Sequence, residues 1–185
     1  MSTFRIPQTV HLSPEAVERA RDFARGVIDT VNYQDSNQTK KKKIYDDHFV
    51  SKLGEEAVRL VFETRNCVVR GPDYRVYNAK QKSWAADLLI NDLDVAVKTQ
   101  RRSAAQRYAL SWTFQDSPKR RDPILSNLEA WVCLVVYEDL KPGCECLVYP
   151  LRRIKQLIFE APRLTRLAGK KQAVYLDTLQ KHKIF

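Results

Sequence analysis

Residues 84–99 read WAADLLINDLDVAVKT, and this stretch decides the fold. Both halves of it are rich in apolar residues of the kind that fill strands. Asn91-Asp92 separates the two halves and is a residue pair typical of a tight turn. The stretch therefore predicts two paired strands, residues 84–91 and 93–99.

Two charged side chains stand within these predicted strands. Because side chains alternate between the two faces of a strand, Asp87 shares a face with Leu89, and Lys98 shares a face with Asp94 and Ala96. An ionised aspartate and a lysine among apolar neighbours are costly unless they pair or bind a ligand. We therefore expect Asp87 and Lys98 to belong to a functional site.

Two helices are predicted before these strands. Ser13-Pro14-Glu15 supplies an N-cap serine, a proline at the first helical position and an acid in the first turn. Apolar residues at helical spacing then continue to about Asn32. A second helix is expected from Tyr45 to Thr64, with an apolar stripe that faces the core. The polar residues 33–43 between the helices end in four lysines and predict a loop.

The segments that follow complete a central sheet flanked by helices. The unbroken apolar run Trp131–Tyr137 is typical of a central strand that is buried on both faces. The other predictions are short strands at 67–70, 74–77 and 145–149, helices at 103–110, at 123–129 and from Pro150, and irregular chain in 161–185.

This order of elements predicts one α/β domain over residues 1–185, with a mixed sheet of about five strands and an extra N-terminal helix. Residues 1–44 form an arm, the first helix and the basic loop. Residues 45–160 form the core, and residues 161–185 form a basic tail.

The charge of the chain favours a polyanionic partner. Its 32 Lys and Arg residues outnumber its 22 Asp and Glu residues, which gives a net charge of +10. Nucleic acid is the commonest such partner, although a basic protein without one has the same composition.

The sequence has no signal-peptide pattern and no apolar run of membrane-spanning length, so we expect a cytoplasmic protein with no membrane partner. Its four cysteines lack the spacing of a zinc site and are expected to be reduced.

The arrangement of Asp87 and Lys98 resembles that of the PD-(D/E)XK nuclease superfamily. Those enzymes carry an aspartate on one strand, an acid-x-lysine on the next and often a glutamate on the preceding helix. Asp87 matches the aspartate, Lys98 matches the lysine, and KLGEEA at residues 52–57 matches the glutamate helix. The predicted order of elements over residues 45–160 also fits that family's core. The resemblance implies a restriction-endonuclease-like core and a DNA endonuclease that uses Mg²⁺ or Mn²⁺.

The resemblance also implies roles for individual residues. Asp87 would bind the metal, and Lys98 would stabilise developing charge or position the attacking water. Helical geometry distinguishes the two helix glutamates, because Glu56 lies close to the apolar stripe and Glu55 lies nearly opposite it. We therefore predict Glu56 as the second metal-flanking acid and Glu55 as a surface residue.

One position departs from the family pattern, because Ala96 stands where the acid of the acid-x-lysine motif belongs. The acid was replaced deliberately, or it moved to another element, or the protein is a natural inactive DNA binder. We favour the first explanation, which predicts that Ala96→Glu restores or raises metal-dependent cleavage. Under the second explanation the candidates for the moved acid are Glu56, Asp94, Asp116 and Asp122.

The candidate DNA contacts lie in two basic segments. Arginine and lysine there suit phosphate contacts, and interleaved aromatic residues suit base stacking. Tyr108, Trp112 and Phe114 either stack on bases in this way or belong to the core. The candidate DNA-binding residues are Lys40, Lys41, Lys42, Lys43, Gln100, Arg101, Arg102, Arg107, Lys119, Arg120 and Arg121.

Three alternatives remain open at this point. The literal Pro72-Asp73 pair is interpreted as a turn instead of the motif aspartate. The runner-up function, after the nuclease, is a catalytically inactive DNA-binding protein with a nuclease fold. The third possible function is a basic interaction protein unrelated to DNA. Enzymes that cut both strands often present two sites, so a homodimer is an expectation by analogy.

Overall fold

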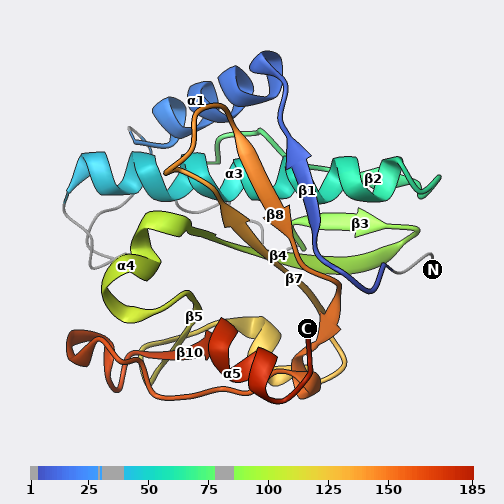
Figure 1. Cartoon of the computed structure of the whole chain (residues 1–185). Helices are drawn as coiled ribbons and strands as arrows, with labels where there is room; N and C mark the ends of the chain where they lie inside the picture. Colours follow the sequence, from blue (N-terminus) through green and yellow to red (C-terminus); the bar gives the residue numbers. More distant parts are fainter. Residues whose placement is uncertain (1–3, 29, 31–39, 78–85) are drawn as a thin grey trace.

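The computed structural model describes residues 4–28, 30, 40–77 and 86–185, with the backbone alone at Arg107 and Tyr108. This part of the chain forms three layers (Figure 1). Helices α1 (Pro14–Ile28) and α3 (Lys41–Glu63) cover one face of a large mixed sheet. A small second sheet and helix α5 (Leu176–Lys181) cover the other face.

The large sheet has seven strands in the order β1-β8-β7-β4-β3-β2, with β9 also paired to β7. Only β4 and β7 run parallel, and the other neighbours are antiparallel. This mixed sheet with helices beside it confirms the predicted α/β class, a central mixed sheet flanked by helices. The strands are β1 (Gln8–His11), β2 (Val69–Arg70), β3 (Leu88–Ile90), β4 (Leu93–Arg101), β7 (Trp131–Tyr137), β8 (Glu145–Val148) and β9 (Arg152–Arg153).

Strand β7 is the buried central strand that its apolar sequence predicts. It lies between β4 and β8, and Val132, Leu134 and Val136 are fully buried against the second sheet. Cys133 and Val135 are fully buried on the opposite face, which packs against α3. Burial of both faces explains why the run contains no polar residue.

The β3–β4 hairpin also forms as predicted. Asn91 and Asp92 have φ angles of 47° and 64°, the left-handed pair that a two-residue hairpin turn with the right twist requires. Leu88 pairs with Val95 in the ladder, so Asp87 enters the hairpin beside Ala96. Residues 84 and 85 of the predicted first strand lie outside the described part of the chain.

The predicted helix start is correct at Ser13 and is four residues too late at the second helix. The Ser13 hydroxyl accepts a hydrogen bond from the Ala16 N–H at 3.3 Å, as an N-cap does. Helix α3 begins at Lys41, with Lys40 as its N-cap, so three lysines placed in a loop are in fact helical. Residues 33–39 of that predicted loop lie outside the described part of the chain.

The C-terminal segment and the small sheet differ most from the prediction. Residues 161–185 are not irregular, since they contain strand β10 (Lys171–Tyr175) and helix α5. Strand β10 pairs with β5 (Ser111–Ser117), which in turn pairs with β6 (Arg120–Arg121). In β5, polar residues alternate with the buried Trp112 and Phe114, and in β10 only the last three residues are buried. Neither strand therefore contains an apolar run long enough to stand out in the sequence.

Several other predicted elements are shorter or absent. Residues 74–77 form no strand, and Pro150 opens no α-helix, because β9 and a 3₁₀ turn (Ile154–Gln156) follow it. The helices predicted near 103–110 and 123–129 are a 3₁₀ turn (Arg102–Ala104), a short α4 (Ala105–Tyr108) and another 3₁₀ turn (Pro123–Ser126). A last 3₁₀ turn covers Thr165–Leu167.

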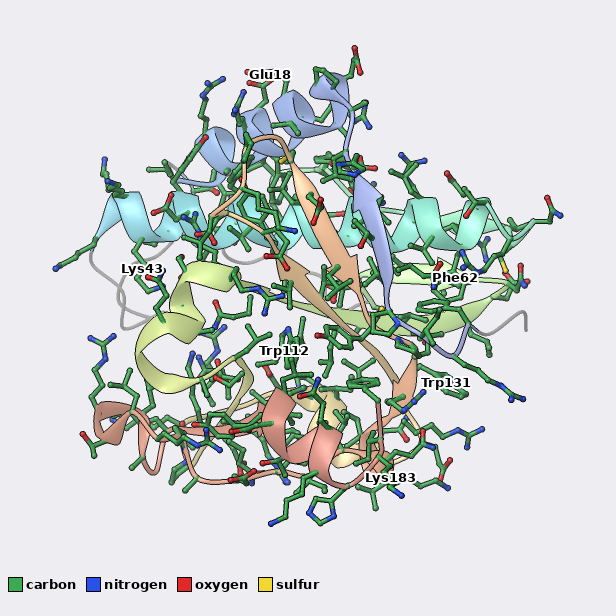
Figure 2. The ribbon with its side chains drawn as sticks, in the orientation of Figure 1. Glu18, Lys43, Phe62, Trp112, Trp131 and Lys183 are labelled. Atoms are coloured by element: carbon green, nitrogen blue, oxygen red, sulfur yellow. The ribbon has the colours of Figure 1, made fainter. Side chains whose placement is uncertain are left out.

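Trp112 and Phe114 of β5 settle one open alternative, since both are core residues. Trp112 lies between the two sheets (Figure 2), and its indole N–H donates to the Val135 carbonyl at 2.8 Å. Phe114 is fully buried. Neither ring can stack on a base, and the side chain of Tyr108 lies outside the described atoms.

Candidate functional site

Asp87 stands at the start of β3, half-buried, with its carboxylate held against β4. The Val97 N–H donates to Oδ2 of Asp87 at 2.7 Å. Burial raises the pKa of Asp87, the Val97 N–H and the ammonium groups of Lys98 and Lys52 oppose the rise, and Asp122 adds to it. Asp87 therefore lies within electrostatic reach of two lysines and a second aspartate that come from three other segments.

Lys98 lies on the same side of the hairpin and is bound to an acid from another part of the chain. Its Nζ lies 2.9 Å from Oδ2 of Asp122, and 5.0 Å from the centre of the Phe114 ring. The Gln115 N–H donates to the same Asp122 oxygen at 3.1 Å. The side chains of Lys98 and Asp122 are 27% and 21% exposed, so this ion pair is reachable from solvent.

Glu55 is the helix acid that interacts with Asp87, and the prediction that placed it on the surface is wrong. It is only 2% exposed, and the Lys52 Nζ lies 2.5 Å from its Oε2. Burial raises the pKa of Glu55 to about 7, Lys52 opposes the rise, and Asp87 adds to it. Glu55 is buried because it lies on the side of α3 that faces the sheet, where the neighbouring Gly54 packs against Thr99 of β4 and Asp87 is within electrostatic reach.

Glu56 is buried as predicted, but its carboxylate is occupied by other residues. Arg19 of α1 lies 3.0 Å from Oε1, and the Tyr74 hydroxyl donates to the same oxygen at 2.7 Å. Arg59 lies 2.7 Å from Oε2. Both oxygens are thus engaged away from Asp87, so the structure does not bring Glu56 to Asp87 as the predicted second metal ligand. Glu56 instead joins α1, α3 and the segment around Tyr74.

Among the four acids considered for the missing motif position, only Asp122 reaches Lys98. Asp94 is exposed, Glu56 is engaged as described, and Asp116 pairs with Arg121 at 3.2 Å. Ala96 itself packs against the core between the two sheets. The carboxylate that accompanies Lys98 therefore comes from residue 122, just before the 3₁₀ turn.

The carboxylates of Asp87 and Asp122 suit a hard divalent cation whose remaining ligands are water and substrate oxygens. Magnesium commonly takes one or two protein carboxylates and keeps several waters, and Asp87 and Asp122 offer two such groups beside Lys98. In the part of the chain that the structure describes, no three His, Cys, Asp or Glu side chains gather closely enough to hold a metal by themselves.

The predicted DNA-binding residues fall into two groups. Exposed ones include Lys40, Lys41 and Lys42 at the start of α3, together with Lys119 and Arg120 at the β5–β6 turn. The others are engaged within the protein: Lys43 with Asp47, Gln100 with the Ser111 carbonyl, Arg101 with Asp46, Arg102 with Glu138, and Arg121 with Asp116. The side chain of Arg107 lies outside the described atoms.

Two lysines of this region carry no signal that singles them out in the sequence. Lys52 is 8% exposed and lies 4.8 Å from the centre of the Phe23 ring and 5.6 Å from that of Tyr74. Lys171 of β10 belongs to a tail that was predicted to be irregular. Only a three-dimensional arrangement brings both of them toward the hairpin.

Asp73 and the cysteines are not part of this arrangement. Asp73 is exposed and accepts a hydrogen bond from the Arg75 N–H at 2.9 Å, the pattern of an aspartate that closes a turn. All four cysteines are free thiols. Within the described residues, no helix combines the length and apolar character needed to cross a membrane.

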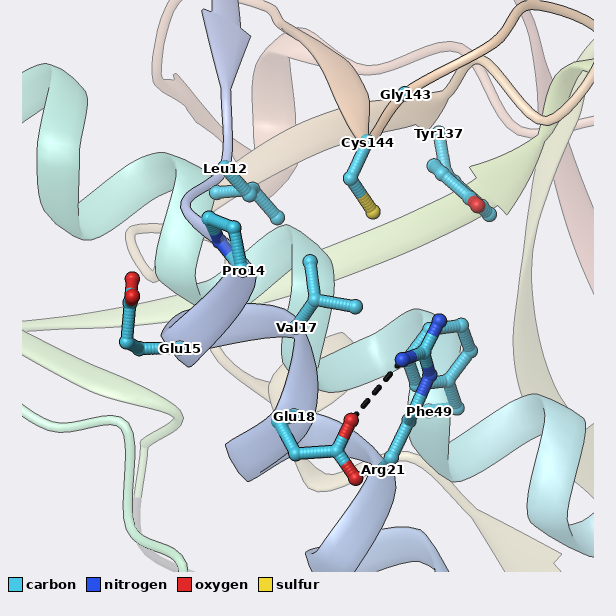
Figure 3. Close-up of a pocket in the computed structure, with 10 residues that line it drawn as sticks. All are labelled: Leu12, Pro14, Glu15, Val17, Glu18, Arg21, Phe49, Tyr137, Gly143 and Cys144. Atoms are coloured by element: carbon cyan, nitrogen blue, oxygen red, sulfur yellow. Dashed lines mark hydrogen bonds and ion pairs between the residues drawn. The ribbon is translucent and has the colours of Figure 1, made fainter.

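A groove of about 760 Å³ lies elsewhere, between the start of α1, α3 and the turn before β8 (Figure 3). Its lining includes Leu12, Phe49, Tyr137 and Cys144 and none of the Asp87 cluster. Glu18 and Arg21 form an ion pair at its rim.

Comparison with known proteins does not identify a family for this chain. No family model matches the chain, and neither a curated protein nor a solved structure shows significant similarity to it.

Proposed function

We propose that this chain is a metal-dependent deoxyribonuclease whose cleavage site is formed by Asp87, Lys98 and Asp122. The observation that carries the proposal is the Lys98–Asp122 ion pair beside Asp87, at 2.9 Å between Nζ and Oδ2. Two carboxylates and an ammonium group are the side chains that phosphodiester hydrolysis with a divalent ion uses. The resemblance of the hairpin and helix to PD-(D/E)XK nucleases supports the same reading, including a restriction-endonuclease-like core.

Each side chain has a role that follows from its contacts. Asp87 and Asp122 would hold Mg²⁺ or Mn²⁺, which polarises a phosphoryl oxygen and lowers the pKa of a bound water. The Val97 N–H fixes one oxygen of Asp87 and so orients the other. Lys98 donates hydrogen bonds to a phosphate oxygen and offsets the negative charge that develops there.

Asp122 takes the place of the acid that the family carries at position 96. A carboxylate that has moved to another element explains why Ala96 is compatible with an active enzyme. This explanation now replaces the deliberate substitution that the sequence alone favoured, because Asp122 already accompanies Lys98. Glu55 is a further acid next to the site: burial raises its pKa to about 7, and its carboxyl group lies within electrostatic reach of Asp87.

A catalytically inactive DNA-binding protein on the same fold is the second candidate. Ala96 favours it, because the motif acid is absent from its own strand. The net charge of +10 fits both candidates equally. Cleavage is therefore the property that separates them.

The test is cleavage of supercoiled plasmid and of linear duplex DNA with Mg²⁺, with Mn²⁺ and with a chelator. We expect nicking or linearisation that needs the metal and that Asp87→Asn reduces by about 100-fold or more. Lys181→Gln is the matched control, since Lys181 is exposed on α5. No cleavage by the unaltered protein, with salt-sensitive DNA binding retained, would select the inactive binding protein instead.

A further inference from the structure

The ammonium group of Lys98 contacts an aromatic ring as well as an acid. Its Nζ lies 2.9 Å from Oδ2 of Asp122. It also lies over the Phe114 ring, 5.0 Å from the ring centre. A cation within about 6 Å of the centre of an aromatic ring is attracted to the electron-rich face of that ring. The acid and the ring both come from the segment 111–122, whereas Lys98 belongs to the large sheet.

Strand β5 fixes the positions of both groups. Phe114 and Gln115 are neighbours on this strand, and Gln115 exchanges hydrogen bonds with Asp122. The Gln115 N–H donates to Oδ2 of Asp122 at 3.1 Å, and the Asp122 N–H donates to the Gln115 carbonyl at 2.9 Å. On its other side Phe114 pairs with Gln172 in the β5–β10 ladder. One strand therefore determines where the ring and the acid meet Lys98.

The Phe114 ring is held rigidly in the core. It is fully buried, and it forms a T-shaped pair with Phe159, with ring centres 5.2 Å apart and ring planes at 74°. Aromatic pairs favour this geometry, so the pair restrains the orientation of the Phe114 ring. Because the ring is buried, water does not compete for its face, and its attraction for a cation is stronger than at an exposed surface.

The ring and the acid differ in what they leave available to a substrate. In the proposed function Asp122 also serves the metal, so its hold on Lys98 weakens when the site is in use. A neutral ring binds no metal, and its contact with the ammonium group leaves the three N–H donors of Lys98 free for oxygen acceptors. Without such a contact, the long lysine side chain would have to be ordered at a cost in conformational entropy.

We infer that Phe114 is a positioning residue: its ring keeps the ammonium group of Lys98 at the site when Asp122 is engaged elsewhere. The consequence for cleavage rests on the proposed function, whereas the contact itself does not. The contact predicts that Lys98 stays over the ring even when the carboxylate of Asp122 is removed. The alternative is that Phe114 serves packing alone and that Asp122 holds Lys98.

The first experiment follows Lys98 by NMR in the full chain with isotope-labelled lysine. The ε-methylene signal of Lys98, identified by its loss in Lys98→Arg, should lie upfield of the other lysine signals because the ring current of Phe114 acts on it. Asp122→Ala should leave the signal upfield, and Phe114→Leu should move it to the ordinary lysine position. Thermal melting shows whether each variant is folded, and Asp122→Asn replaces the alanine variant if that one is not.

The second experiment separates the charge distribution of the ring from its shape. Phenylalanines with one, two or three ring fluorines at position 114 withdraw electrons from the ring face and change its size little, so they keep the test valid if Phe114→Leu does not fold. The rate of metal-dependent cleavage should fall stepwise, by about fivefold in total. The fall should appear in kcat and not in KM, because Lys98 acts on charge that develops during the reaction.

The same fluorinated series at Phe62 is the control, because Phe62 is equally buried but lies in the core cluster that contains residues of α3. It should leave the cleavage rate unchanged. A constant rate along the Phe114 series, or an equal fall in both series, would show that the ring acts by packing alone and would overturn the inference.

The two experiments distinguish failure of this inference from failure of the proposed function. If the unaltered chain never cuts DNA while the Lys98 signal stays upfield in the Asp122 variant, the contact stands and the proposed cleavage fails. If the chain cuts DNA and the signal moves to the ordinary lysine position in that variant, the proposed function stands and the inference fails. The inference also fails if the unaltered protein shows no upfield lysine signal.

Discussion

The ammonium group of Lys98 lies 2.9 Å from a carboxylate oxygen of Asp122, a residue 24 positions further along the chain. The strand that carries Lys98 has only a methyl group at the neighbouring site position, Ala96. The small sheet helps to hold the Asp122 carboxylate in place, because the Gln115 N–H donates to the same Asp122 oxygen at 3.1 Å. The second layer of the fold is therefore part of the candidate site, and its packing fixes the acid's position.

Asp122 should be needed for cleavage, and an acid at position 96 should compensate for its loss. We expect Asp122→Ala to reduce metal-dependent cleavage by about 100-fold or more, because it removes a metal-binding carboxylate. Adding Ala96→Glu to that variant should recover part of the rate, since residue 96 lies on the same face as Lys98. Cleavage rates of the two variants and the unaltered chain provide the measurement.

Asp116→Ala is the control for this pair, because Asp116 lies on the same strand system but pairs with Arg121. It should cut DNA at nearly the normal rate. Full activity in Asp122→Ala would remove Asp122 from the site. A double variant no better than the single one would show that position 96 cannot present an acid to the metal.

Glu55 should make the folded protein less stable as the pH rises toward neutrality. Its pKa is raised from 4.5 to about 7 by burial, so the folded state holds a proton that the unfolded chain has already released. The associated stability is present below pH 4.5 and is lost as the pH rises to about 7. The slope approaches 1.4 kcal/mol per pH unit at most for one proton.

Urea unfolding across this pH window measures the effect. The free energy of unfolding of Glu55→Gln should lack this fall, so the gap between the variant and the unaltered protein should change steadily with pH. Glu18→Gln is a suitable control, because Arg21 lowers the pKa of Glu18 and places its titration below the window. Parallel pH curves for the unaltered protein and Glu55→Gln would contradict the raised pKa.

The elements that the sequence predicted well are those whose pattern is complete within one segment. Helix α1 has its own cap and spacing, the β3–β4 hairpin has its own turn pair, and β7 has its own apolar run. These signals are local, so they can be recognised without knowing the contacts that the rest of the chain makes. The side-chain alternation in the hairpin likewise placed Lys98 on the face of Ala96, and the strand register then adds Asp87 beside that position.

The elements that were missed depend on contacts between distant segments. Strand β10 has only three buried residues and forms by pairing with β5, and neither strand has a strong pattern alone. Glu55 seemed exposed because the helix was considered by itself, whereas that side of α3 faces β4 and Asp87. Asp122 could be named as a candidate from its residue type, but its contact with Lys98 requires the small sheet.

Glu56 should contribute to stability and not to cleavage. Its carboxylate is 1% exposed and engages Arg19, Arg59 and the Tyr74 hydroxyl. Glu56→Gln removes the negative charge that two arginines share, and we expect a loss of about 3 kcal/mol in the free energy of unfolding. Glu63→Gln is the matched control on the same helix: Glu63 is 38% exposed and pairs only with Arg59, so it should lose less than about 1 kcal/mol.

Both measurements come from urea unfolding at neutral pH, followed by cleavage assays well below the melting temperature. A folded Glu56→Gln protein should cut DNA at a rate within about twofold of normal, since Glu56 touches neither Asp87 nor Lys98 and a rate change of that size is a small free energy. A loss of cleavage as large as that of Asp87→Asn would return Glu56 to the site.

Helix α3 and strand β4 approach each other closely at Gly54 and Thr99, and substitutions at these two residues should change the stability of the protein in opposite directions. An added Cβ at Gly54 would lie 1.8 Å from the Thr99 hydroxyl oxygen, so Gly54→Ala should destabilise the protein by about 1–3 kcal/mol through overpacking.

The Thr99 hydroxyl oxygen is buried and has no hydrogen-bond partner among the described residues. Thr99→Val keeps the shape and removes the unpaired oxygen, so it should stabilise the protein by about 1 kcal/mol. Thr64→Val is the control, because the Thr64 hydroxyl donates to the Val61 carbonyl at 3.0 Å and its loss should not stabilise. A destabilised Thr99→Val protein would mean that the Thr99 hydroxyl has a partner in solution, such as an ordered water between the helix and the strand.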